Sequence, residues 1–221
     1  MRKYIRKIAA LFMCFVLAVS LGSVANGVEW VSGSRWKYVE TYGNHKRCLI
    51  KANATYVLTD WRYGLTRAYN NWNTYSGGYV KVQEASFNDA TLTIHTRDGL
   101  VGVPDNPEFD SVIGMTLIQD TNGNIYSVSS RPSNFGSQIK SAMIVLNNEY
   151  SSGKIISTSD ADKNRAKSIG HEIGHCLNLD HRPQNSIMVQ GWDIDRLHIG
   201  GNVNYDRPTT LDISDLSSMY R

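Results

Sequence analysis

The sequence lacks several features that would mark whole classes of protein. It contains no internal repeat and no linker, so its 221 residues are expected to form one domain with a full core. It has one long apolar run, at the N-terminus, and three cysteines in all. No basic stripe is present along the chain, which removes the main argument for a nucleic-acid partner.

The apolar run has the pattern of a secretory signal peptide. Four basic residues lie within positions 2–7, the apolar segment Ile8–Leu21 follows, and Ser23-Val24-Ala25 supplies small residues at the expected cleavage site. The run is too short to span a bilayer comfortably. We interpret it as a bacterial export signal over residues 1–25. Residues 26–221 are then a single secreted, extracellular domain without a stable membrane anchor.

Removal of this segment also changes the net charge. It holds four of the 23 Lys and Arg residues and none of the 20 Asp and Glu residues, which leaves 19 basic against 20 acidic side chains. The mature chain is therefore near −1, although the whole sequence is +3. The basic isoelectric point consequently says nothing about nucleic acid, and we expect no such partner.

The most informative stretch is H-E-x-x-H at 171–175 with a third histidine six residues later. On a helix, His171 and His175 lie one turn apart and about 40° around the axis, so both imidazoles can bind one metal ion. Glu172 is placed to take a proton from a water on that metal. For His181 to join them, the helix must end soon after Leu177, and Asn178 tolerates the left-handed conformation that such a turn needs.

With this spacing, the sequence resembles the metzincin clan of zinc metallopeptidases, whose signature is H-E-x-x-H-x-x-G-x-x-H. Asn178 stands where the clan has Gly. Ser186-Ile187-Met188, seven residues after His181, resembles the clan's Met-turn. The segment 208–216 resembles the closing helix of the matrixin-like branch.

The resemblance implies a secreted zinc-dependent endopeptidase with an α+β, zincin-like fold. The expected fold is a twisted mixed sheet with two long helices above a cleft, and a smaller C-terminal subdomain with the Met-turn and a final helix.

The resemblance also implies roles for single residues. His171, His175 and His181 would bind one catalytic Zn²⁺, Glu172 would be the catalytic base, and Met188 would form an apolar floor. A protein or peptide substrate would bind in extended form along an edge strand, for which the resemblance indicates Gly114–Gln119. It also places pocket walls at Trp192, Leu197 and Tyr205.

Hydrophobic periodicity predicts the other elements. Thr59-Asp60 should cap a helix with a buried aromatic face, Ser159 should open the helix that carries the histidines, and Pro208-Thr209 should begin the last helix, with Thr209 and Asp212 as capping partners. Asn122-Gly123 is typical of a type I′ hairpin turn. The predicted strands are 48–58, 79–83, 90–95, 114–119, 125–129 and 141–146.

Several alternatives stay open at the level of sequence. Cys48 and Cys176 would form a disulfide or remain buried thiols, and a third hypothesis, from the resemblance, is that Cys48 inhibits the zinc as a thiolate. Asp105, Asn106 and Asp110 offer oxygen ligands for calcium, but their spacing matches no dedicated loop and leaves calcium unsupported. The function could instead be a non-catalytic secreted binding protein on a metzincin frame, or a cell-wall peptide amidase. The intact Glu172 argues against the first of these.

The signal-peptide interpretation makes a direct prediction. Export should cleave the chain after Ala25, because this position ends the small-residue site that follows the apolar segment. N-terminal sequencing of the secreted protein is expected to begin at Asn26. A secreted product that still begins at Met1 would contradict the assignment.

Overall fold

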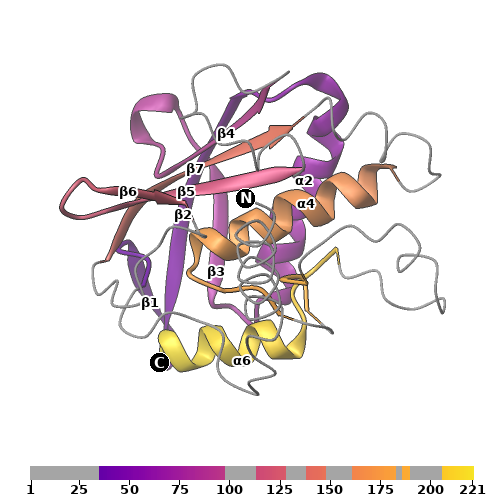
Figure 1. Cartoon of the computed structure of the whole chain (residues 1–221). Helices are drawn as coiled ribbons and strands as arrows, with labels where there is room; N and C mark the ends of the chain where they lie inside the picture. Colours follow the sequence, from indigo (N-terminus) through magenta and orange to yellow (C-terminus); the bar gives the residue numbers. More distant parts are fainter. Residues whose placement is uncertain (1–34, 98–112, 128–137, 148–160, 183–185, 190–205) are drawn as a thin grey trace, which may run out of the picture.

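The structure is a computed structural model, and it describes residues 35–97, 113–127, 138–147, 161–182, 186–189 and 206–221. Within these residues, seven strands form one open, twisted mixed sheet and three α-helices accompany it (Figure 1). The predicted mixed α+β class is therefore confirmed. The strands are β1 (Val39–Tyr42), β2 (His45–Tyr56), β3 (Val80–Glu84), β4 (Leu92–Arg97), β5 (Gly114–Asp120), β6 (Ile125–Ser127) and β7 (Ile139–Asn147). The helices are α2 (Thr59–Tyr75), α4 (Ala161–Cys176) and α6 (Thr210–Met219), with a 3₁₀ turn, η1, at Phe87–Asp89.

The sheet has the order β1-β2-β4-β7-β5-β6, and β3 also pairs with β2. The β2–β3, β2–β4 and β4–β7 pairs are parallel, whereas β5 runs antiparallel to both β7 and β6. On one side, β5 pairs with β7 along the whole length of β5. On its other side, β5 pairs with β6 only at Leu117–Gln119. Half of the predicted edge strand is thus covered by β6. Among the described strands, none pairs with that side of Gly114–Thr116.

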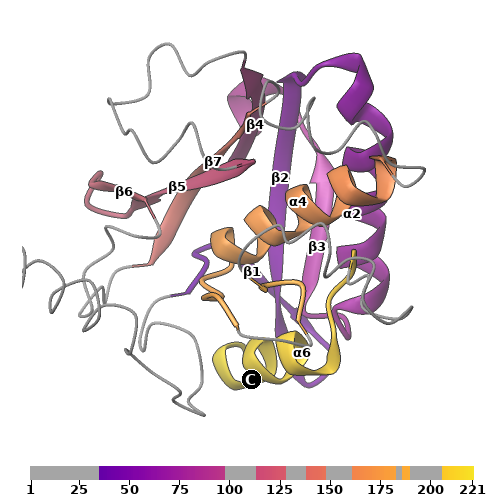
Figure 2. The same cartoon turned by 45° about the vertical axis from the view of Figure 1, so that its right-hand side comes forward.

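Helices α2 and α4 lie on the same face of the sheet and pack against each other (Figures 1 and 2). They approach closely at Gly64, where a Cβ atom would lie 2.7 Å from the Cβ of Arg165. The indole Nε1 of Trp72 donates a hydrogen bond of 3.0 Å to the carbonyl of Gly170, which fixes the two helices relative to each other. As predicted, the buried face of α2 is formed by Trp61, Leu65, Ala68, Tyr69 and Trp72. No helix in the described part of the chain is long and apolar enough to cross a membrane.

The C-terminal helix α6 lies near the start of β2 (Figure 2). The backbone N–H of Lys46 donates to the carbonyl of Tyr220 at 2.8 Å. The hydroxyl of Tyr220 accepts a hydrogen bond from the backbone N–H of Trp36 at 2.9 Å. The predicted apolar side of this helix is confirmed for Leu216, Met219 and Tyr220, which are buried, but is wrong for Leu211, which is 38% exposed.

Several boundaries differ from those predicted. β2 ends at Tyr56 instead of Leu58, where the chain turns and the Val57 N–H donates to the carbonyl of Ala54 at 3.1 Å. The carbonyl of Val57 accepts a hydrogen bond from Arg62 on the following helix. Leu58 is consequently the N-cap of α2, and Thr59 and Asp60 lie within its first turn. The strands predicted at 79–83 and 90–95 are shifted by one and two residues, and those predicted at 114–119 and 141–146 are longer than predicted. The strand predicted at 125–129 is described over Ile125–Ser127, and its last two residues lie outside the described part of the chain. The sequence pattern missed β1 and η1 altogether.

The β5–β6 hairpin forms as predicted, but its turn is not of type I′. That turn requires a positive φ at both central residues, whereas Gly123 has φ +89° and Asn122 does not have a positive φ. The carboxylate of Asp120 accepts hydrogen bonds from the backbone N–H groups of Asn122 and Asn124, at 2.8 and 2.9 Å. An Asx-type turn therefore replaces the two-residue turn that Asn-Gly indicated.

Candidate metal centre

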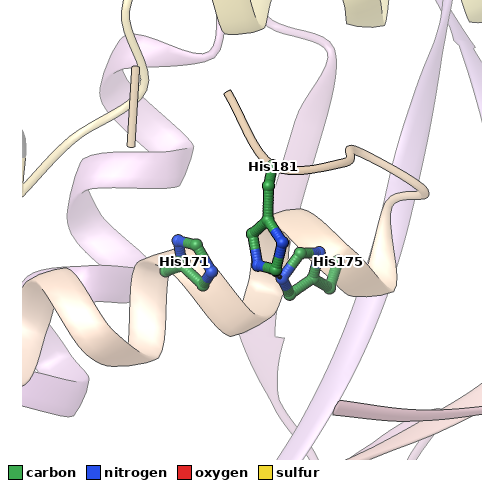
Figure 3. A group of neighbouring side chains, drawn as sticks. All are labelled: His171, His175 and His181. Atoms are coloured by element: carbon green, nitrogen blue, oxygen red, sulfur yellow. Dashed lines mark hydrogen bonds between the residues drawn. The ribbon is translucent and has the colours of Figure 1, made fainter. Parts of the chain in front are cut away.

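Helix α4 carries two of the three histidines. Its apolar stripe of Ala166, Ile169 and Ile173 is fully buried, as predicted. Because this stripe packs into the core, the side chains on the opposite face of the helix point away from it. His171 and His175 are four residues apart and project from that face (Figure 3). Their ring centroids are 4.7 Å apart. The register of the helix against the core thus brings both imidazoles to one place.

The helix ends where the sequence required it to end. Asn178 has φ +72°, the one positive φ among the described residues other than glycine. The N–H of Leu179 donates to the carbonyl of Gly174 at 3.0 Å, and the N–H of Asn178 donates to the carbonyl of His175 at 3.0 Å. These two bonds form a Schellman motif, with Asn in the position that Gly usually takes. The chain turns back and brings His181 over the helix.

One ring nitrogen of each of His171, His175 and His181 lies within 4.8 Å of the other two. The Nε2 atoms of His175 and His181 are 3.1 Å apart. In Figure 3 the three imidazoles face a common point. Three imidazoles with this spacing form a group able to hold a metal ion, and zinc accepts such a set.

The second nitrogens of the two helical histidines have partners that the sequence did not reveal. His171 Nδ1 is 2.9 Å from the carbonyl oxygen of Ile187, and His175 Nδ1 is 2.9 Å from that of Leu179. A carbonyl oxygen can only accept, so each Nδ1 carries the proton and each Nε2 keeps a lone pair. Backbone acceptors of this kind orient metal-binding histidines, so these residues fit a zinc ion.

Burial favours the uncharged form of His171 and His181. Burial, together with the neighbouring His181, lowers the pKa of His171 to about 3. Burial also lowers the pKa of His181, against the opposing effect of the Asp180 carboxylate. Neutral imidazoles are the form that binds a metal.

Glu172 lies on the side of α4 that faces β5. Its carboxyl group is buried, and the Thr116 hydroxyl donates to Glu172 Oε2 at 2.7 Å. Burial raises the pKa of Glu172 to about 7, and the hydrogen bond from Thr116 opposes that rise. A carboxyl group that titrates near neutral pH can both accept and return a proton.

The Met-turn packs directly beneath the helix. A Cβ atom on Gly174 would overlap the sulfur of Met188, and one on Gly170 would lie 2.7 Å from Cδ1 of Ile187. Glycine costs about 1 kcal/mol relative to alanine inside a helix. Here the two glycines let the Met-turn approach the backbone of α4. Met188 is accordingly buried against the helix.

Asp212 anchors this turn from helix α6. Its fully buried carboxylate accepts hydrogen bonds from the Ser186 hydroxyl, from the Ile187 N–H at 3.2 Å, and from the N–H and hydroxyl of Thr209 at 2.7 and 2.9 Å. The predicted capping box of Thr209 and Asp212 is confirmed. Its second role as the anchor of the Met-turn was not visible in the sequence, because Ser186 lies 26 residues away.

Cys48 and Cys176 are free, buried thiols, which decides against a disulfide between them. Burial raises the pKa of Cys48 to about 12, so this side chain is unsuited to act as a thiolate on the metal. His95 stacks on Tyr56 with 5.2 Å between ring centroids and does not belong to the three-histidine group. The calcium candidates Asp105, Asn106 and Asp110 and the wall candidates Trp192, Leu197 and Tyr205 lie outside the described residues.

Comparisons with known proteins add little to this geometry. No family model matches the chain, and no curated protein matches it. Among solved structures, that of myroilysin matches with a TM-score of 0.38 and 16% identity over 80% of this chain. The chain covers 66% of myroilysin, slightly under two thirds of its length. A likeness of this size carries no information about chemistry, so the assignment depends on the site itself.

Replacing His181 by alanine should weaken zinc binding, because one of three nitrogen ligands is lost. We expect the loss of affinity to exceed the roughly 10- to 100-fold that follows removal of an outer partner. Competition with a chromophoric chelator measures it. His95→Ala is the matched control and should bind zinc as the wild type does. Equal affinities for the two variants would place the third ligand elsewhere.

Replacing Asp212 by asparagine should loosen the Met-turn. The amide puts two donors where the carboxylate accepts from four, so at least one buried donor loses its acceptor. The free energy of unfolding should fall by about 1–3 kcal/mol. Zinc affinity should fall as well, because the Ile187 carbonyl that holds His171 belongs to this turn. Urea unfolding of the metal-free protein tests the first effect, and the exposed Asp89→Asn should leave stability unchanged.

Proposed function

We propose that this protein is a secreted zinc-dependent endopeptidase of the metzincin type, matrixin-like. One observation carries the proposal: three imidazoles converge on one point, and the Nδ1 contacts of His171 and His175 leave a lone pair on each Nε2. The buried carboxyl group of Glu172 lies on the same helix as these two histidines. A cluster of three histidines with incidental spacing would not need the two carbonyl acceptors that fix its tautomers. The Met-turn packed beneath the helix supports the same assignment.

Each residue has a chemical role in this proposal. His171, His175 and His181 would hold zinc, which supplies a Lewis acid and lowers the pKa of bound water toward about 7. Glu172 would accept a proton from the attacking water and pass it to the leaving amine nitrogen. Both transfers would use the one carboxyl group, to which the Thr116 hydroxyl donates a hydrogen bond of 2.7 Å. Met188 would shape the floor of the site without binding the metal.

The substrate would be a protein or peptide that binds in extended form along β5. Among the described strands none covers the outer side of Gly114–Thr116, and this end of β5 contacts Glu172. An extended peptide paired there would place a backbone carbonyl close to the catalytic carboxyl group. Backbone pairing accepts many sequences, so the choice among them would come from side-chain pockets.

Replacing Glu172 by glutamine should strongly reduce catalysis and leave the metal in place, because the amide cannot accept the proton. We expect kcat/KM to fall about 10²- to 10⁴-fold, with unchanged zinc content. The measurement is cleavage of casein and of a broad peptide library by the mature protein, with and without a chelator. Glu84→Gln, an exposed substitution on β3, is the control and should retain full activity.

The same assay separates the other functions. Chelator-sensitive cleavage of peptides supports the endopeptidase. Cleavage of peptidoglycan fragments alone would indicate a cell-wall amidase. A zinc-loaded protein that cleaves neither would indicate a non-catalytic binding protein, and activity retained by Glu172→Gln would refute the assignment of the base.

A further inference from the structure

Two positions on β5, two residues apart, contact the side chain of Glu172. A Cβ atom built on Gly114 would lie 3.0 Å from Glu172 Oε1, 3.1 Å from its Cγ and 3.3 Å from its Cδ. Thr116 Oγ1 lies 2.7 Å from Glu172 Oε2. Alternate residues of a strand project from the same face, so both contacts come from the face that α4 covers. The two residues form a socket around one carboxyl group.

The Thr116 hydroxyl is buried and has more than one neighbour. Besides Glu172 Oε2 it lies 3.0 Å from the backbone carbonyl of Glu172, and it hydrogen-bonds the thiol of Cys176. A hydroxyl has one proton, and the carboxylate oxygen is both the nearer and the more strongly accepting of its two oxygen neighbours.

A hydroxyl at this position needs an explanation, because valine has nearly the same shape and suits a buried strand at least as well. Burying a hydroxyl has a cost that only a hydrogen bond offsets. The offset here comes from Glu172, which lies 56 residues away in the sequence. Two interpretations follow. The hydrogen bond from the Thr116 hydroxyl stabilises only the packing of β5 against α4, or it also fixes the orientation of the Glu172 carboxyl group.

We propose that Thr116 is a positioning residue, whose hydroxyl holds the Glu172 carboxyl group in one orientation within the space that Gly114 leaves. This inference rests on the proposed function, since it concerns the base of that reaction. Held at Oε2, the carboxyl group cannot rotate freely about its last bond. A misplacement of about 1 Å at a reacting group can lower the rate about 100-fold, so this restraint should appear in kcat.

The test compares Thr116→Val, which keeps the shape and removes the hydroxyl, with Thr116→Ser, which keeps the hydroxyl. For a peptide that the wild type cleaves, Thr116→Val should lower kcat roughly 10- to 100-fold and leave KM and zinc content unchanged. Thr116→Ser should restore most of the rate. The control is Thr96→Val on β4, whose hydroxyl bonds the backbone of Tyr56 and Leu58. An unchanged kcat in Thr116→Val, or no recovery in Thr116→Ser, overturns the proposal.

Gly114→Ala gives a second variant, should Thr116→Val fold poorly. Its backbone has no positive φ, so alanine is tolerated there and its Cβ should displace the carboxyl group. We expect kcat to fall while zinc stays bound, and an unchanged kcat counts against the socket.

Crystal structures of the zinc-loaded wild type and Thr116→Val separate this inference from the proposed function. A wild type that holds zinc and cleaves nothing refutes the proposed function. The socket is then judged by the position of the Glu172 carboxyl group alone. If Thr116→Val leaves that group in place, the positioning role is wrong, and if the group moves, the role stands.

Discussion

The site depends on a single reversal of the chain at the end of α4. Two imidazoles on a helix leave a metal ion poorly enclosed, and the third ligand must come from residues that follow the helix. The left-handed Asn178 makes this possible, because it ends the helix with a Schellman motif two residues after Cys176. The same turn presents the Leu179 carbonyl to His175. One backbone conformation thus supplies both the third histidine and an orienting partner for the second.

The remaining support comes from a continuous path of contacts that begins in α6. Asp212 binds the Met-turn, the Ile187 carbonyl of that turn holds His171, and Met188 rests on Gly174. The final helix therefore helps to orient a histidine that precedes it by some 40 residues. This explains why buried polar groups are tolerated so close to the core: in this network each finds a partner, which removes most of the cost of burial.

The Glu172 side of helix α4 is positioned by β5. Glycine at 114 lets the strand approach, and threonine at 116 supplies a donor to Glu172. Because β6 pairs only with Leu117–Gln119, the end of β5 that holds Glu172 has no partner on its outer side among the described strands. The strand that we propose to receive the substrate therefore also holds the proposed base.

The sequence by itself determined what depends on local spacing: the histidines on one face of α4, the turn at Asn178, the aromatic face of α2 and the capping box of α6. These follow from helical periodicity and from the conformational preferences of single residues. It did not determine the partners of Glu172, His171 and Asp212, the pairing that covers half of β5, or the end of β2. Only the tertiary structure decided these, because each joins groups that lie far apart along the chain or depends on which side chains the packing leaves within reach of a hydrogen bond.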